Sequence, residues 1–168
     1  NLPMPNNISC IITDDEPKMV ELLADTLSEL YPEIEIKGKY TTWKQALSGI
    51  RTHNVDILFL DISMPEKTGF DLLELIPNLQ AEVIFVTAHT EFAVEAFNFD
   101  VCGYVLKPIN DKALLKAVET GGVKAALRAA TEGAAAQGVE GVPAVVVGER
   151  VFWGDDRLEE AVEASATG

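Results

Sequence analysis

Five short runs of β-branched and aliphatic residues alternate with stretches of helical periodicity along the first 120 residues, and this alternation limits the fold more than any other feature. Parallel strands that are joined by helices are buried on both faces of their sheet, so they read as continuous apolar runs. We therefore predict an α/β fold, a doubly wound five-stranded parallel sheet with five helices on its two faces. The expected strands are residues 8–13, 34–40, 55–60, 82–86 and 103–106, and four of the five helices are expected at 17–30, 43–50, 92–97 and 112–118.

The chain is strongly acidic, which limits its partners. It holds 27 Asp and Glu against 13 Lys and Arg, a formal net charge of -14 that would repel nucleic acids and anionic lipids. No apolar run reaches the roughly 18 residues that span a bilayer, and residues 1–7 show no signal-peptide pattern. We therefore expect a cytoplasmic protein that contacts neither nucleic acid nor membrane directly.

Residue usage changes abruptly near position 120. All 11 isoleucines precede this point, whereas 11 of the 19 alanines follow it within only 48 residues. A glycine pair, Gly121 and Gly122, lies at the break, and glycine pairs commonly end helices. We predict a first domain of residues 1–120 and a second segment of residues 121–168, joined either naturally or by engineering.

Polar residues follow four of the five expected strands. In a doubly wound sheet, ligands bind beyond the carboxyl ends of the strands, so these residues should share one edge. Crowded carboxylates repel one another unless a cation lies between them, and Mg²⁺ prefers oxygen ligands. The pattern therefore predicts a Mg²⁺ site beside a carboxylate that can accept a phosphoryl group. The residues are Asp14 and Asp15 after the first strand, Asp61 after the third, Thr87 after the fourth and Lys107 after the fifth.

Taken singly, each of these residues has a simpler explanation. The aspartate pair could cap the helix that begins near Pro17, Thr87 could be an ordinary strand-end hydroxyl, and Lys107 a solvated charge. Their joint placement favours the metal and phosphoryl site.

Four segments, IITDDEP, LFLDISMPEKTGFDLL, VIFVTAHTEFAVEAF and GYVLKPI, resemble the receiver domain of bacterial two-component response regulators over residues 7–119. The resemblance implies a flavodoxin-like receiver fold and a signalling protein rather than an enzyme, with phosphotransfer and dephosphorylation that are self-catalysed. It implies a histidine kinase as phosphodonor and Asp61 as phosphoacceptor. The implied Mg²⁺ ligands are Asp14, Asp15, Asp61 and the Ser63 backbone carbonyl.

The same resemblance implies how the phosphorylated state is read out and how long it lasts. Lys107 would pair with the phosphoryl group, ahead of a cis bond to Pro108, while Thr87 and Tyr104 would be the switch hydroxyl and switch aromatic. The side chains of Ser63 and His89 would flank the approach of hydrolytic water and so tune dephosphorylation. A homodimer through the fourth helix, fifth strand and fifth helix is implied as well. The stretch from Thr87 to Ile109 is most similar to receivers that carry LytTR-type DNA-binding output domains, and residues 121–168 do not resemble such a domain.

Residues 123–162 are similar to the last part of DsbA-like and 2-hydroxychromene-2-carboxylate isomerase thioredoxin-fold proteins. The resemblance implies a helix-hairpin-helix appendage with a cis bond before Pro143. A lone hairpin is marginal in water, so it must pack on the receiver, on its own helices or on a second copy. The residues expected to make this contact are Val145, Val147, Phe152 and Trp153. The family's first βα unit, which carries the catalytic Ser or Cys, is missing, so we interpret the segment as an incomplete fragment without chemistry of its own.

Three other functions stay open. A glutathione-dependent isomerase or oxidoreductase fragment is disfavoured by the missing βα unit. An aspartate-nucleophile phosphatase would carry a second Asp two residues after the nucleophile, where Ser63 stands. An inactive chimaera of two folds would lack reactivity towards acylphosphates.

Overall fold

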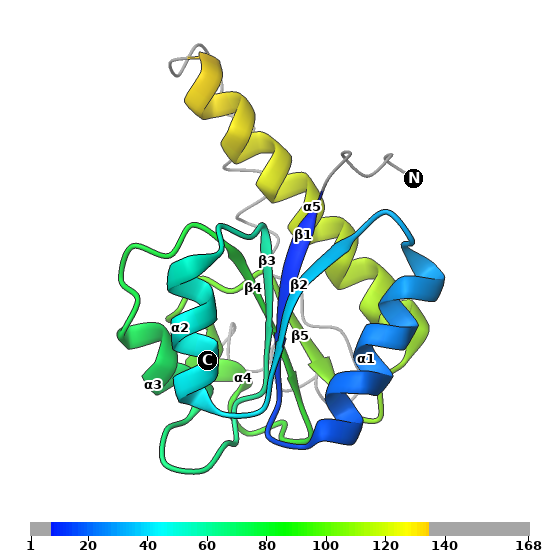
Figure 1. The fold of residues 1–168 in the computed structure, drawn as a ribbon, viewed down its shortest axis with the longest axis vertical. Helices are drawn as coiled ribbons and strands as arrows, with labels where there is room; N and C mark the ends of the chain where they lie inside the picture. The colour runs from blue at the N-terminus through cyan, green and yellow to red at the C-terminus, as the bar shows by residue number, and fades with distance from the viewer. Residues whose placement is uncertain (1–7, 135–168) are drawn as a thin grey trace.

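The computed structural model describes residues 8–134 and contains five strands that alternate with five helices. All neighbouring strands are parallel, in the order β2-β1-β3-β4-β5 (Figure 1). The predicted α/β doubly wound sheet is therefore confirmed, whereas the predicted hairpin and last helix lie outside the described residues. The elements are β1 (Ser9–Thr13), α1 (Pro17–Leu30), β2 (Glu35–Tyr40), α2 (Trp43–Thr52), β3 (Ile57–Leu60), α3 (Gly69–Glu74), β4 (Glu82–Thr87), α4 (Ala93–Phe97), β5 (Gly103–Leu106) and α5 (Asp111–Ala134).

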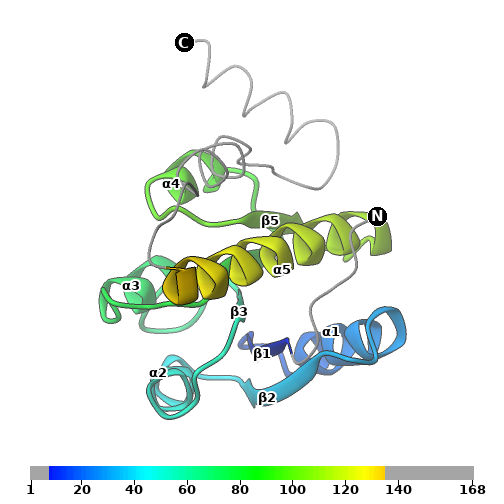
Figure 2. The same cartoon turned by 90° about the horizontal axis from the view of Figure 1, so that it is seen from above.

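Helices cover both faces of the sheet, which explains the uninterrupted apolar strands. The helices α2, α3 and α4 lie on one face, and α1 and α5 lie on the other (Figures 1 and 2). Every residue of β1, β3, β4 and β5 is buried, whereas β2 at the sheet edge alternates between exposed and half-buried positions. Two apolar clusters form the core, one on each side of the sheet.

Local capping fixes the helices that precede and follow the central strands. The Thr42 hydroxyl accepts a hydrogen bond from the Gln45 backbone N–H at 3.2 Å at the start of α2. At the start of α3, Thr68 and Asp71 form a capping box, in which each side chain accepts from the backbone N–H of the other residue. The capping box at Thr68 sets where the loop after β3 ends.

The last helix is much longer than the sequence predicts. We expected an end near Val118, before the glycine pair, but α5 continues through Gly121 and Gly122 to Ala134. A side chain on Gly121 would lie 3.3 Å from both the Cys102 Sγ and an Ile57 carbon, so glycine here permits close packing of helix on sheet. The alanine-rich sequence that follows has high helix propensity. The predicted helix end is therefore wrong, while the domain boundary near residue 120 stays a prediction.

As a result, α5 projects past the edge of the sheet at which the strands begin (Figure 1). Despite its 24 residues, neither α5 nor another helix in the described part of the chain is apolar enough over a sufficient length to cross a membrane.

Candidate phosphoacceptor site

Three carboxylates meet where the order of the strands reverses. β1 lies between β2 and β3 in the sheet, so the chain first continues to one side of β1 and then returns to its other side. Ligands bind at such switch points in open α/β sheets. Asp14 directly follows β1 and Asp61 directly follows β3, and their side chains are only 7% and 5% exposed. Asp15 is half-buried beside them. One carboxylate oxygen from each residue lies within 4.8 Å of the others.

Lys107 brings a positive charge into this group of carboxylates. It follows β5 and precedes Pro108 through a cis peptide bond, which confirms that expectation. Its Nζ lies 2.8 Å from the Asp14 Oδ2, 3.4 Å from the Asp61 Oδ2 and 3.6 Å from the Glu16 Oε1. Burial alone would lower the pKa of Lys107, but the hydrogen bond to Asp14 and the charge of Asp61 raise it above its ordinary value. Lys107 is therefore held as a cation.

One lysine does not neutralise the group. Burial, followed by the charge of Asp14, raises the pKa of Asp61 to about 6, although Lys107 and the Ser63 N–H oppose this shift. The Ser63 N–H donates to the Asp61 Oδ1 at 3.3 Å. The positive charge of Lys107 therefore does not fully compensate the negative charge of ionised Asp61. The donor set consists of carboxylate oxygens, the ligands that Mg²⁺ prefers, so these residues fit that ion.

A second group of residues is connected through the backbone of His89. Thr87 ends β4 with a fully buried side chain, and its Oγ1 accepts a hydrogen bond from the His89 N–H at 3.3 Å. Tyr104 on β5 is also fully buried, and its hydroxyl donates to the His89 carbonyl oxygen. The Thr87 and Tyr104 side chains thus bind the N–H and the carbonyl oxygen of the same residue, His89, which lies two positions after the end of β4.

The family of the chain follows from its sequence once this geometry is known. A family model described as "Response regulator receiver domain" matches residues 10–119. The chain belongs to this receiver family. Residues 10–119 are therefore a receiver domain of a two-component response regulator with an acidic pocket of Asp14, Asp15 and Asp61, a signalling module rather than a catalytic enzyme. Receivers of this family act together with histidine kinases.

Curated relatives share the receiver and extend beyond it. The chain is 40% identical over 113 residues to an uncharacterized response regulatory protein of Shewanella oneidensis, covering 67% of this chain and 48% of that protein. It is 34% identical over 110 residues to the transcriptional regulatory protein BtsR of Escherichia coli, covering 65% and 46%. The chain thus spans about half the length of the curated relatives it matches.

Solved structures show the same fold. The isolated receiver domain of RcsB from Salmonella enterica serovar Typhimurium, with the phosphomimetic BeF3-, matches with a TM-score of 0.62 and 23% identity, covering 68% of this chain and 88% of that one. A CheX-CheY-BeF3-Mg+2 complex from Borrelia burgdorferi matches with a TM-score of 0.60 and 23% identity, covering 67% and 87%. At this identity the similarity is evidence of the receiver fold alone.

A second family model, described as "DSBA-like thioredoxin domain", matches residues 108–166. This match bears out the resemblance of the tail and begins further upstream than residue 123. It overlaps the receiver match over residues 108–119, and α5 lies within its range. Residues 111–119 of α5 therefore lie in both matches, and the rest of the helix lies in the second match alone.

Sequence reasoning missed several neighbours of the receiver site. Glu16 contacts Lys107, and the Nδ1 of His89 lies 3.1 Å from the Glu91 Oε2, which orients a ring that is 42% exposed. In the loop after β3, the Glu66 backbone has a left-handed φ of 71°, and its side chain accepts a hydrogen bond from the Trp43 Nε1 at 3.1 Å. The pairing of Glu66 with Trp43 joins residues 23 positions apart and has no local sequence signal.

Proposed function

We propose that Asp61 of this receiver accepts a phosphoryl group from a phosphohistidine of a partner histidine kinase, with Mg²⁺ held by Asp14, Asp15, Asp61 and the Ser63 carbonyl. The observation that carries the proposal is the buried cluster in which the Asp14, Asp15 and Asp61 oxygens approach within 4.8 Å while Lys107 contacts two of them. A carboxylate that is ionised, buried and short of positive charge is suited to receive an electrophilic phosphorus. We propose that this phosphoryl transfer takes place in the cytoplasm.

The proposed transfer uses the side chains in distinct roles. An Asp61 carboxylate oxygen attacks the phosphorus, the bond from phosphorus to the histidine nitrogen breaks, and that nitrogen keeps the electron pair. Lys107 moves from the Asp14 and Asp61 oxygens to donate to a phosphoryl oxygen, and the Thr87 hydroxyl donates to another. When bound, Mg²⁺ would neutralise charge on the phosphoryl oxygens.

The direct test is the intact mass of the full chain after incubation with acetyl phosphate. We expect one added phosphoryl group in the presence of Mg²⁺, and no addition with EDTA or in Asp61→Asn. Asp25→Asn, which changes an exposed carboxylate on α1, is the matched control and should be phosphorylated like the parent. Unchanged mass of the folded parent with donor and Mg²⁺ would contradict the proposal and favour an inactive chimaera.

A switch through Thr87 is part of the proposal. Phosphorylated Asp61 would draw the Thr87 hydroxyl towards it, away from the His89 N–H, and so shift the segment that Tyr104 also contacts. This charge would bias the face formed by α4, β5 and α5 towards a second copy of the chain.

For this switch, we expect Thr87→Ala to keep the phosphorylation of Asp61 but to lose most of the change in oligomeric state that follows it. Sedimentation velocity of parent and variant, each with and without donor, measures the change. Thr90→Ala, a half-buried threonine three positions along, is the control. An equally strong response in Thr87→Ala would rule out the coupling.

His89 provides a smaller prediction about the lifetime of the phosphorylated state. Hydrolysis needs a water in line with the phosphorus, and an imidazole two residues after Thr87 can orient that water, whereas Ser63 is short. We expect His89→Ala to change the dephosphorylation rate several-fold, the scale of one contact of about 1 kcal/mol, with the phosphorylated fraction at saturating donor unchanged. Phosphate release after donor removal gives the rate. Identical dephosphorylation rates of the parent and His89→Ala between pH 6 and pH 8 would show that His89 takes no part in hydrolysis.

A further inference from the structure

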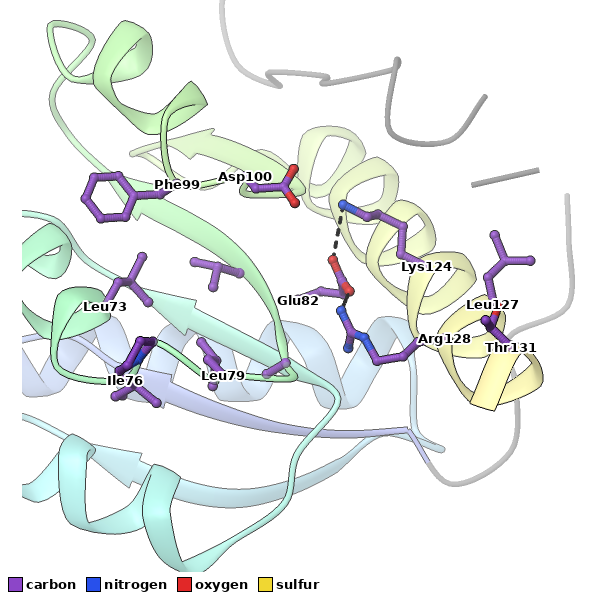
Figure 3. Close-up of a pocket in the computed structure, with 13 residues that line it drawn as sticks. Leu73, Ile76, Leu79, Glu82, Phe99, Asp100, Lys124, Leu127, Arg128 and Thr131 are labelled. Carbon is purple, nitrogen blue, oxygen red and sulfur yellow. Dashed lines mark hydrogen bonds and ion pairs between the residues drawn. The ribbon is translucent and has the colours of Figure 1, made fainter. Parts of the chain in front are cut away.

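A groove of about 620 Å³ lies at the edge of the sheet opposite to Asp61, beside the first residues of β4 (Figure 3). One wall is apolar and comes from α3, the segment that follows it and the residues just before β5. The other wall is the projecting part of α5. The main lining residues are Leu73, Ile76, Leu79 and Phe99 on the first wall, and Lys124, Leu127, Arg128 and Thr131 on α5.

The charges in the groove are balanced, so the groove favours an apolar occupant. The buried Glu82 carboxylate pairs with Lys124 at 3.2 Å and with Arg128, and Asp100 is the other acidic residue of the lining. Two cations thus face two carboxylates. The apolar surfaces of Ile76, Leu79 and Phe99 are only half-buried, and covering them would be favourable.

The chain itself supplies an apolar segment within reach. α5 ends at Ala134, three residues after Thr131, which lines the groove. Residues 135–141 are small or polar except for Val139, and the next twelve residues, VPAVVVGERVFW, are mostly apolar. Seven extended residues reach at most about 25 Å, whereas α5 rises about 15 Å from Lys124 to its end. Residues 142–153 can therefore return along the whole α5 wall.

Two further observations favour this segment over a separate partner. One family model matches residues 108–166, so α5 and residues 142–153 belong to the same match. A tethered segment is also present at an effective concentration of about millimolar, far above that of a second copy in dilute solution. Aromatic side chains bury the largest area per residue, so Phe152 and Trp153 are the best anchors.

We propose that residues 142–153 dock intramolecularly in the groove between α5 and the apolar wall of Ile76, Leu79 and Phe99, with Phe152 and Trp153 as anchors. Docking covers the apolar edge of the receiver and makes the tail a support for the projecting part of α5. The proposal concerns a surface remote from Asp61 and does not depend on phosphorylation.

Tryptophan fluorescence tests the proposal, because the chain has only two tryptophans, Trp43 and Trp153. In the full chain with Trp43→Phe, we expect Trp153 to emit at short wavelength and to resist quenching by acrylamide. Ile76→Asp puts a charge into the groove and should raise the quenching constant several-fold. Leu22→Asp is the matched control, since Leu22 is 48% exposed on α1, and it should leave the quenching unchanged.

A variant in the tail covers the case in which Ile76→Asp disturbs the receiver. Val145→Asp and Val147→Asp together should raise the amide hydrogen exchange of residues 76–83 and 124–131 in the full chain and should raise the quenching of Trp153. Three results would overturn the proposal: Trp153 quenched in the parent as fast as free N-acetyltryptophanamide, protection of Trp153 that rises with protein concentration and so comes from a second copy, or hydrogen exchange that the tail variant leaves unchanged.

Discussion

Without divalent cations at pH 8, Asp61→Asn is expected to unfold at a higher urea concentration than the parent, with a free energy of unfolding larger by about 1 to 3 kcal/mol. The cause is the position of Asp61, whose side chain is 5% exposed next to the carboxylate of Asp14. Burial and this neighbour raise the pKa of Asp61 from 3.8 to about 6. Asparagine keeps the shape of the side chain and removes the charge.

The effect should depend on pH in a defined direction. Because the folded-state pKa of Asp61 lies above its unfolded value, folding takes up a proton between about pH 4 and pH 6. The parent therefore loses stability as the pH rises through this window, and the ionised carboxylate has its full cost above it. The advantage of Asp61→Asn should be near zero at pH 4, should grow up to about pH 6 and should then stay constant.

Urea unfolding of parent, Asp61→Asn and the exposed control Asp25→Asn measures this difference at several pH values. Adding Mg²⁺ should stabilise the parent more than Asp61→Asn, because an ion that binds only the folded state adds to its stability and the variant lacks one of the ligands. The gap between the two proteins should therefore narrow. A parent that is more stable than Asp61→Asn in EDTA at pH 8 would show that the carboxylate is better compensated than the structure indicates.

The loss of stability caused by ionised Asp61 is expected if this residue accepts a phosphoryl group as proposed. The fold holds Asp14 and Asp61 together although they repel, because each directly follows a fully buried central strand, β1 or β3. A buried carboxylate with a raised pKa, such as that of Asp61, is typical of functional sites. The packing of the strands thus fixes the position of Asp61 that the proposed phosphoryl transfer requires.

The central strands and the residues at their ends could be predicted because both depend on local sequence. Apolar runs such as residues 57–60 and 83–86 indicate strands buried on both faces, and parallel strands place their carboxyl ends at one edge. From this alone Asp14, Asp61 and Lys107 are expected to meet, and the structure places them in contact. The roles of Thr87, Tyr104, Ser63 and His89 follow from the family resemblance and stay predictions.

The length of α5 could not be predicted, because the role of Gly121 depends on residues far away in sequence. Glycine reads as a helix end when only its neighbours are considered. In the fold, Gly121 faces Ile57 of β3 and Cys102 just before β5, and a side chain on Gly121 would crowd both residues. Which of these two roles a glycine has is decided by tertiary packing.

The second large effect is expected at the other edge of the sheet, where Glu82, the one charged residue of β4, is its first residue. Its side chain is only 5% exposed, and Lys124 and Arg128 of α5 supply its cations from 42 and 46 positions away. Replacing Lys124 and Arg128 together by methionine keeps most of their apolar stems but leaves the Glu82 carboxylate buried without a partner. We expect a loss of about 3 to 5 kcal/mol in the free energy of unfolding at pH 8.

The triple variant separates the cost of an unpaired charge from the loss of packing. Replacing Glu82 by methionine as well should recover most of the lost stability, because a buried ion cluster exchanged for apolar groups of similar size is often neutral or stabilising. Urea unfolding of the parent, the double and the triple variant gives these values, with Lys112→Met in the exposed first turn of α5 as the control.

The part of the fold that loses stability distinguishes a local effect of the Glu82 ion pairs from a general effect of the changed net charge. Lys124 and Arg128 lie on the alanine-rich part of α5 that continues beyond the glycine pair, so few other large side chains can hold this part of the helix. Amide hydrogen exchange in the double variant should therefore rise first in residues 124–134, before the strands exchange, because segments with few buried contacts open locally. A double variant that loses stability while this end of α5 stays protected, or a triple variant no more stable than the double, would show that Glu82 does not anchor the helix.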